Sequence, residues 1–167
     1  MAEKDEIFAS KIKYNGIFSF KDFYLFCYDW LTEETALFMS EKKYKEKISG
    51  DSKNIEVEWT GFTKFTDYFK FEIKIKFQLL GITEVEVQEG GAKIKTNKGS
   101  VEMKVAGTLV KDYDGKFEST WLRKTVRAIY EKWIIASRIE QFEEKIIEKC
   151  DEFLNQSKAY LDLEGKK

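Results

Sequence analysis

The most regular stretch of the chain runs from Asp67 to Gly81, where apolar and polar residues alternate almost without error. The apolar positions of this stretch are Phe69, Phe71, Ile73, Ile75, Phe77 and Leu79. A period of two predicts a β-strand with one buried face and one solvated face. The same period begins at Ala36 and predicts strands at about 36–48, 54–64, 68–80, 83–88, 92–96 and 101–112.

Turn-forming residues separate most of these strands. The segments SGDSKN, QEGGAK and TNKGS are rich in Gly, Asn, Asp and Ser, which favour tight turns. Gly81 interrupts the alternation without such a cluster, so it indicates a bulge or a bend rather than a clear chain reversal. Hairpins joined by short turns predict an antiparallel meander that is apolar on one face and charged on the other.

The N-terminal part of the chain predicts a strand followed by a helix. KIKYNGIF, residues 11–18, has the short alternation of a first strand. Ser19 suits the N-cap of a helix, and Asp22 lies in the first turn, where a carboxylate favours the helix dipole. Apolar residues then follow at spacings of three and four up to Leu31. This helix is apolar nearly all round, so we expect it to be covered on several sides.

A long helix is predicted at the C-terminus, from Ser119 or Thr120 to about Leu161, with no Gly or Pro inside it. At 1.5 Å per residue, some forty residues span roughly 60 Å, whereas a domain of this size is only about 35–40 Å across. Its apolar stripe also drifts around the helix near Ser137. We therefore expect this helix to kink, to break near 136–137, or to project.

These elements predict an α+β fold in the order β-α-β6-α, with an antiparallel meander packed against the long C-terminal helix. The 167 residues are enough for one domain with a proper core, and no linker or repeat divides them. We therefore expect a single domain over 1–167. Residues 138–163 form the distal part of the last helix, which either projects or folds back.

This order of elements resembles the helix-grip superfamily, to which START-like lipid-transfer domains and pollen-allergen-type proteins belong. The matching stretches are KIKYNGIF, SFKDFYLFCYDWL, the strands up to GTLVKDY, and TWLRKTVRAIYEKWIIA as the gripping helix. The resemblance lies in element order over most of residues 10–137. The amino-acid composition, rich in Lys, Glu and Phe, is also similar to that of uncharacterised families of small-genome archaea. Helix-grip folds curl the sheet around the last helix and leave an apolar cavity, so the resemblance implies an apolar or lipid ligand.

The amino-acid composition excludes several classes of function. The chain has no His, which excludes His-activated nucleophiles and His-ligated metals, and it has no nucleotide-binding or hydrolase motif. Lys+Arg number 29 against 30 Asp+Glu, and only three cations are Arg, which argues against nucleic acid as a partner. No apolar run is long enough to span a bilayer and no signal region is present, so we expect a cytoplasmic protein. Cys27 and Cys150 are expected to be buried free thiols, with a disulfide as the alternative.

Three sets of residues are candidates for binding. The first is an apolar face that is either core or the wall of a ligand site, and its lack of inward polar groups favours core: Trp59, Phe69, Phe71, Ile73, Phe77, Ile129 and Trp133. The second is the distal helix stripe, a candidate partner interface: Ile139, Phe142, Ile146 and Phe153. The third is a set of cations that either contact an anion or pair with nearby carboxylates: Arg123, Lys124 and Arg127.

No catalytic residue, cofactor or metal ligand is predicted, and we expect the protein not to be an enzyme. Asp29, which has apolar neighbours on both sides, is the most arguable carboxylate for acid–base work, but a solvated helix end explains it more simply. The first functional hypothesis is a non-catalytic binding or assembly module that acts through its amphipathic C-terminal helix, as a homodimer or with another protein. The alternative is a helix-grip carrier of an apolar small molecule or lipid between sheet and helix.

Overall fold

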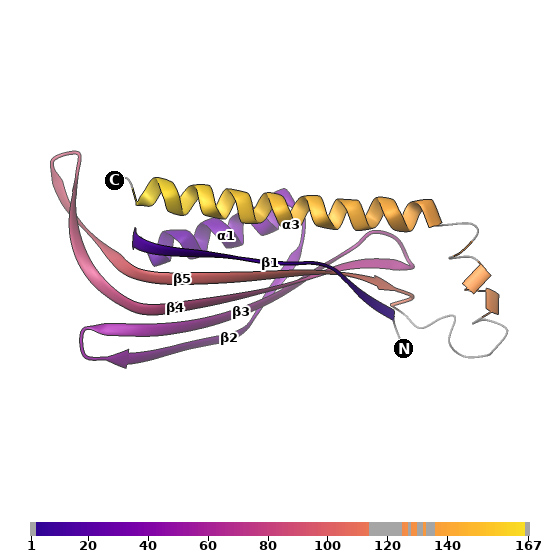
Figure 1. The fold of residues 1–167 in the computed structure, drawn as a ribbon, viewed down its shortest axis with the longest axis horizontal. Helices are drawn as coiled ribbons and strands as arrows, with labels where there is room; N and C mark the ends of the chain where they lie inside the picture. The colour runs from indigo at the N-terminus through magenta and orange to yellow at the C-terminus, as the bar shows by residue number, and fades with distance from the viewer. Residues whose placement is uncertain (1–2, 114–124, 127, 130–131, 133–135, 166–167) are drawn as a thin grey trace.

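The computed structural model describes residues 3–113, 125–126, 128–129, 132 and 136–165. It confirms the predicted α+β class, with an antiparallel sheet packed against a C-terminal helix (Figure 1). The elements, in chain order, are β1 (Glu3–Phe18), α1 (Phe20–Glu34), β2 (Phe38–Ser49), β3 (Ser52–Lys64), β4 (Phe69–Glu89), β5 (Ala92–Lys111) and α3 (Ala136–Glu164).

The five strands form one sheet in the order β1-β5-β4-β3-β2, and every neighbouring pair is antiparallel. β2 to β5 follow one another as a meander, and β1 completes the sheet by pairing with β5, so that Ile12 lies opposite Met103. Both helices lie on the same side of the curved sheet (Figure 1). The sheet therefore has an inner face toward the helices and an outer face without a helix among the described residues.

The strands after α1 are fewer and longer than predicted, since β4 and β5 each join two predicted strands. At Gly81, with φ +63°, the pairing register shifts between Leu80 and Thr83, so this glycine marks a bulge within β4. The segment TNKGS is not a turn but the middle of β5, paired with β4 and β1. A Cβ at Gly99 would lie 2.5 Å from Ile82 Cδ1, so glycine is needed there for close packing inside a strand.

α1 begins as predicted, because the Ser19 hydroxyl accepts a hydrogen bond from the Asp22 amide at 3.3 Å. One stripe of the helix is fully buried, and it includes Cys27. The Cys27 Sγ lies 3.8 Å from the hydroxyl of Ser157 on α3, so the two helices meet directly. Both Cys27 and Cys150 are buried free thiols, as expected for the first of the two alternatives.

α3 covers the sheet, and the residues described between 121 and 132, which belong to the segment predicted to grip it, are exposed. Ile146, Cys150 and Phe153 of α3 have no exposed surface, whereas Val126 and Ile129 are 49% and 51% exposed. The prediction that Ile129 belongs to the core face is therefore wrong, and Trp133 lies outside the described residues. α3 starts at the predicted break and lies along the sheet instead of projecting (Figure 1).

The distal helix stripe, predicted either to project or to fold back, folds back onto the sheet. Ile146 and Phe153 are fully buried, and Ile139 and Phe142 pack against the same core. The Phe142 ring lies 4.8 Å from the Phe65 ring and 5.1 Å from the Phe69 ring. A helix of 29 residues is about 44 Å long, which matches a long twisted sheet, so the stripe finds its partner within the chain.

The inner face of the sheet is filled by its own aromatic side chains. Five predicted members of the apolar face are at most 3% exposed: Trp59, Phe69, Phe71, Ile73 and Phe77. The Phe77 ring lies 4.8 Å from the Trp59 ring and 6.0 Å from the Phe23 ring of α1. Side chains packed at these distances favour core over the wall of a ligand cavity.

Candidate anion-binding site

The outer face of the sheet carries the most unusual side-chain arrangement among the described residues. Lys104 of β5 lies directly opposite Lys11 of β1 and directly opposite Lys76 of β4. Three lysines therefore form a row across three adjacent strands. Lys74 lies two residues from Lys76 on the same face of β4.

Such a row opposes folding. Side chains directly opposite each other on antiparallel strands have Cβ atoms about 4.5–5.5 Å apart, and like charges there are destabilising. Two such pairs lower the free energy of unfolding by on the order of 1 kcal/mol in total at low ionic strength. In the alternating pattern these lysines were interpreted as ordinary solvated charges, whereas strand pairing brings cation against cation.

The space beside this row is hollow. Two residues from Lys11 and from Lys104, on the same face of the sheet, lie the small side chains of Ala9 and Ala106, which are directly opposite each other. The lysine side chains therefore border a depression of about 490 Å³. We call it the lysine hollow, and its lining residues are Ala9, Ser10, Lys11, Lys74, Lys76, Lys104, Val105 and Ala106. All four charged side chains of this lining are cationic, so the hollow has an apolar floor and a positively charged rim.

The carboxylates around the hollow balance only part of this charge. Glu102 is shared by three lysines, with its oxygens 3.8 Å from Lys11 Nζ, 3.6 Å from Lys13 Nζ and 3.6 Å from Lys104 Nζ. Glu58 pairs with Lys74 at 3.1 Å. Lys76 lies directly opposite Glu58 of β3, and its charge helps to lower the pKa of Glu58 and Glu56, but no carboxylate among the described residues lies within ion-pair distance of its Nζ. The site thus keeps a net positive charge.

The pKa values of these carboxyl groups respond to the lysines. The hydrogen bond from Lys74 holds the pKa of Glu58 below its usual value. For Glu102, desolvation alone would raise the pKa, but the combined charge of Lys11, Lys13 and Lys104 lowers it below the usual value. Both carboxyl groups therefore stay ionised at neutral pH, and the net charge of the site at that pH is set by the lysine excess.

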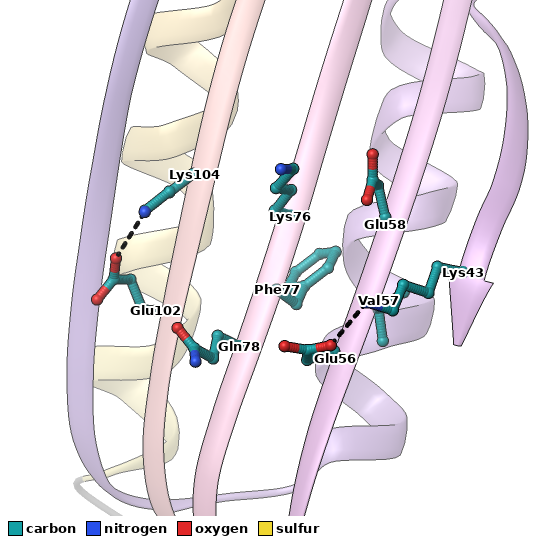
Figure 2. Close-up of a pocket in the computed structure, with 9 residues that line it drawn as sticks. All are labelled: Lys43, Glu56, Val57, Glu58, Lys76, Phe77, Gln78, Glu102 and Lys104. Atoms are coloured by element: carbon teal, nitrogen blue, oxygen red, sulfur yellow. Dashed lines mark ion pairs between the residues drawn. The ribbon is translucent and has the colours of Figure 1, made fainter. Parts of the chain in front are cut away.

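A second, smaller hollow of about 150 Å³, whose lining residues are drawn in Figure 2, shares Lys76 and Lys104 with the first. We call it the mixed hollow, because its charged rim consists of Lys43, Glu56, Glu58, Lys76, Glu102 and Lys104, with the Gln78 amide among them. Lys43 Nζ lies 2.8 Å from a Glu56 oxygen, and their hydrogen bond lowers the pKa of Glu56. Three cations and three carboxylates make this hollow electrically balanced.

The residues singled out from the sequence lie elsewhere. Arg123, Lys124 and Arg127, the predicted anion contacts, lie outside the described residues. Asp29 is exposed on α1, so it lacks the burial on which an acid–base role depended. Within the described part of the chain, no group of three or more Cys, Asp and Glu side chains is arranged to hold a metal ion. No helix in that part is long and apolar enough to cross a membrane.

The lysine hollow was not predicted, although one signal for it exists in the sequence. KIK at 74–76 places two cations on one strand face, but the partners Lys11 and Lys104 are distant in sequence and enter only through strand pairing. Periodicity assigns a side chain to a face but does not assign its neighbour on the next strand.

Comparisons with known proteins do not assign the chain to a family. Neither a protein-family model nor a curated protein matches the chain. Among solved structures, an uncharacterized protein from Rhizobium leguminosarum aligns over 93% of this chain and 99% of its own, with 6% sequence identity and a TM-score of 0.19. A likeness at this level carries no argument about fold or function. The class of the protein is therefore stated from its own architecture: an antiparallel sheet with helices on one face and a charged, hollowed outer face.

Proposed function

We propose that this protein is a non-catalytic binding module and that it binds an anionic ligand, such as a phosphate group, in the lysine hollow. The observation that carries the proposal is the row Lys11–Lys104–Lys76, which places like charges directly opposite one another around an apolar floor. An arrangement that opposes folding is retained most readily where it serves a ligand, because local rules are broken chiefly at functional sites.

The charge balance of the site supports an anion of more than one charge. Four ammonium groups line the hollow, and two carboxylates, Glu58 and Glu102, pair with three of them. A bound dianion would compensate the remaining charge and remove the repulsion along the row. Lys76, which lacks an ion pair among the described residues, is the side chain most available to the ligand.

The helix stripe first considered for assembly has a different role in this proposal. Ile146 and Phe153 hold α3 on the sheet, so the outer face of the sheet is the accessible surface instead. The helix-grip resemblance and its apolar carrier function stay predictions without a specific observation in their favour, because the inner-face rings of Trp59 and Phe77 fill the space between sheet and helix.

Isothermal titration calorimetry with inorganic phosphate tests the proposal. The wild-type protein should bind phosphate, and the Lys76→Gln variant should bind it about tenfold more weakly. One lost charge contact near a protein surface is worth about 1–4 kcal/mol, and about 1.4 kcal/mol corresponds to a factor of ten in Kd.

The matched control is Lys93→Gln, which removes an exposed lysine at the far end of the same strand pair as Lys104. This control should bind phosphate as the wild type does. Absence of phosphate binding by the wild type, or an equal loss in both variants, would contradict binding in the lysine hollow.

A further inference from the structure

We infer that the ligand is a polyhydroxylated phosphate monoester, such as a sugar phosphate, whose phosphate lies in the lysine hollow and whose hydroxyl groups extend into the mixed hollow. This inference rests on the proposed function, since it assigns the phosphate end to the same site. Its own support comes from the second hollow and from the way the two are joined.

The two hollows form one continuous surface, because Lys76 and Lys104 belong to the rim of both. Along β4 the rim runs from Lys74 in the lysine hollow to Gln78 in the mixed hollow. Four residues of strand cover about 13 Å at a rise of roughly 3.3 Å per residue. That length suits a phosphate followed by a ring of sugar size, and it exceeds the size of a lone oxyanion.

The chemistry of the mixed hollow selects hydroxyl groups over a second charged group. Lys76, Lys104, Glu58 and Glu102 also belong to the charge balance of the lysine hollow, and the remaining pair, Lys43 and Glu56, neutralises itself at 2.8 Å. This end of the surface therefore adds no net charge that would select a second charged group. A hydroxyl group donates one hydrogen bond and accepts others, which matches a rim that presents carboxylate acceptors beside ammonium donors.

Gln78 strengthens the case for hydroxyl recognition. Its side-chain amide lies among these charges in Figure 2 and makes no hydrogen bond to another described residue. An amide offers two N–H donors and one carbonyl acceptor, so it pairs with vicinal hydroxyl groups in either direction. One oxygen of Glu56 pairs with Lys43 Nζ at 2.8 Å, so the carboxylate keeps further lone pairs for a ligand donor.

Calorimetric titration of three probes tests the inference: inorganic phosphate, glucose 6-phosphate and glucose. Glucose 6-phosphate should bind about tenfold more tightly than phosphate, because one or two net hydrogen bonds correspond to roughly that factor. Glucose alone should show no measurable binding. The double variant Glu56→Gln/Gln78→Ala should lose the tenfold advantage of the sugar phosphate and bind phosphate no more weakly than the wild type, since it removes no lysine.

The outcomes separate this inference from the proposed function. If phosphate binds and glucose 6-phosphate binds no more tightly, the inference is wrong and the anion site stands. If the double variant retains the full advantage, the sugar contacts another surface and the inference is again wrong. If none of the probes binds, the proposed function itself fails. A Glu86→Gln variant, at an exposed position far along β4, serves as the matched control and should behave as wild type.

The same chemistry occurs in a free sugar phosphate and in a phosphorylated inositol headgroup of a lipid. Co-sedimentation with phosphatidylcholine vesicles, with and without phosphatidylinositol 4-phosphate, distinguishes the two sources. Sedimentation only with the phosphorylated vesicles, reversed by soluble inositol phosphate, would assign the lipid source. Binding of soluble probes without vesicle sedimentation would assign the free compound.

Discussion

Gly107 of β5 determines how closely α3 approaches the sheet. A Cβ built at this position would lie 2.8 Å from Cys150 Sγ and 2.8 Å from Ile146 Cγ2, both on α3. Separations below 3 Å are not tolerated between such atoms without movement of the helix. The two buried α3 side chains therefore occupy the space that glycine leaves, and the fit is specific to this pair of elements.

We therefore expect Gly107→Ala to lower the free energy of unfolding by roughly 1–3 kcal/mol, the usual cost of overpacking a core. Chemical denaturation checks this value. In a Cys150→Ala background, where Sγ is absent, the same substitution should cost clearly less. An equal cost in both backgrounds would show that Cys150 does not limit the approach of the helix.

Tyr160 of α3 is a second residue whose environment has a measurable consequence. Its ring stacks on Phe26 of α1 at 4.6 Å. Burial raises the pKa of Tyr160 to about 12, and the negative charges of Glu164 and Asp22 act in the same direction. The folded protein thus holds this phenol proton at pH values where the unfolded chain, with the ordinary tyrosine pKa of about 10, has lost it.

The difference between the ultraviolet absorbance titrations of the wild type and Tyr160→Phe should therefore have its midpoint near pH 12. The sign for stability follows from the raised pKa. The contribution of Tyr160 is complete below about pH 10 and is lost as the pH rises toward 12. Tyr160→Phe should accordingly lose less stability than the wild type over that interval. A midpoint near 10 would contradict the desolvation of this half-buried phenol.

At the scale of elements, the sequence predicted well which helices and strands form, and poorly which helix covers the sheet. The period of two around Phe69 to Leu79 predicted the central strand, and Ser19 predicted the start of α1, since both signals are local. Turn chemistry misled at TNKGS, because pairing on both sides keeps Asn97 and Gly99 within β5. The Asn97 side chain accepts a hydrogen bond from the Phe20 amide at 3.1 Å. This is a tertiary contact, and the turn propensity of Asn does not predict it.

The prediction that Ile129 lies on the sheet was wrong for a related reason. The proximal stripe and the distal stripe are both amphipathic, and a hydrophobic period does not say which of them meets the sheet. Ile146, Phe153 and Leu161 are buried, so α3 is a helix that packs on the sheet. Of the two alternatives for the distal stripe, packing on its own chain is therefore the one observed.

Because Phe153 is fully buried while Ile147 on the same helix is 43% exposed, these two positions make a matched pair. Phe153→Ala should lower the free energy of unfolding by about 3–5 kcal/mol, the cost of deleting a buried aromatic ring. Ile147→Ala should change it by no more than about 0.5 kcal/mol. Thermal or denaturant unfolding of both variants checks the difference. Similar costs for the two would contradict the docking of α3 by this stripe.

At the scale of the whole molecule, charge is separated between layers although the net charge is only −1. The five strands carry 17 basic and 12 acidic side chains, whereas α1 and α3 carry 5 basic and 12 acidic ones. Composition alone predicted no field that attracts anions. The fold changes this conclusion, because it segregates the acidic helices to one side and brings Lys11, Lys76 and Lys104 together on the other. Attraction of an anion by this side weakens as salt screens it.

The location of anion binding is the central claim, and a two-dimensional NMR titration with inorganic phosphate tests it most directly. Backbone amide shifts should change chiefly at Ala9, Lys76, Lys104 and Ala106, which line the lysine hollow. The Lys76→Gln variant should need about tenfold more phosphate for the same shifts. Shift changes confined to residues 123–127, where the sequence alone had suggested an anion contact, would contradict the claim, as would a spectrum that phosphate leaves unchanged.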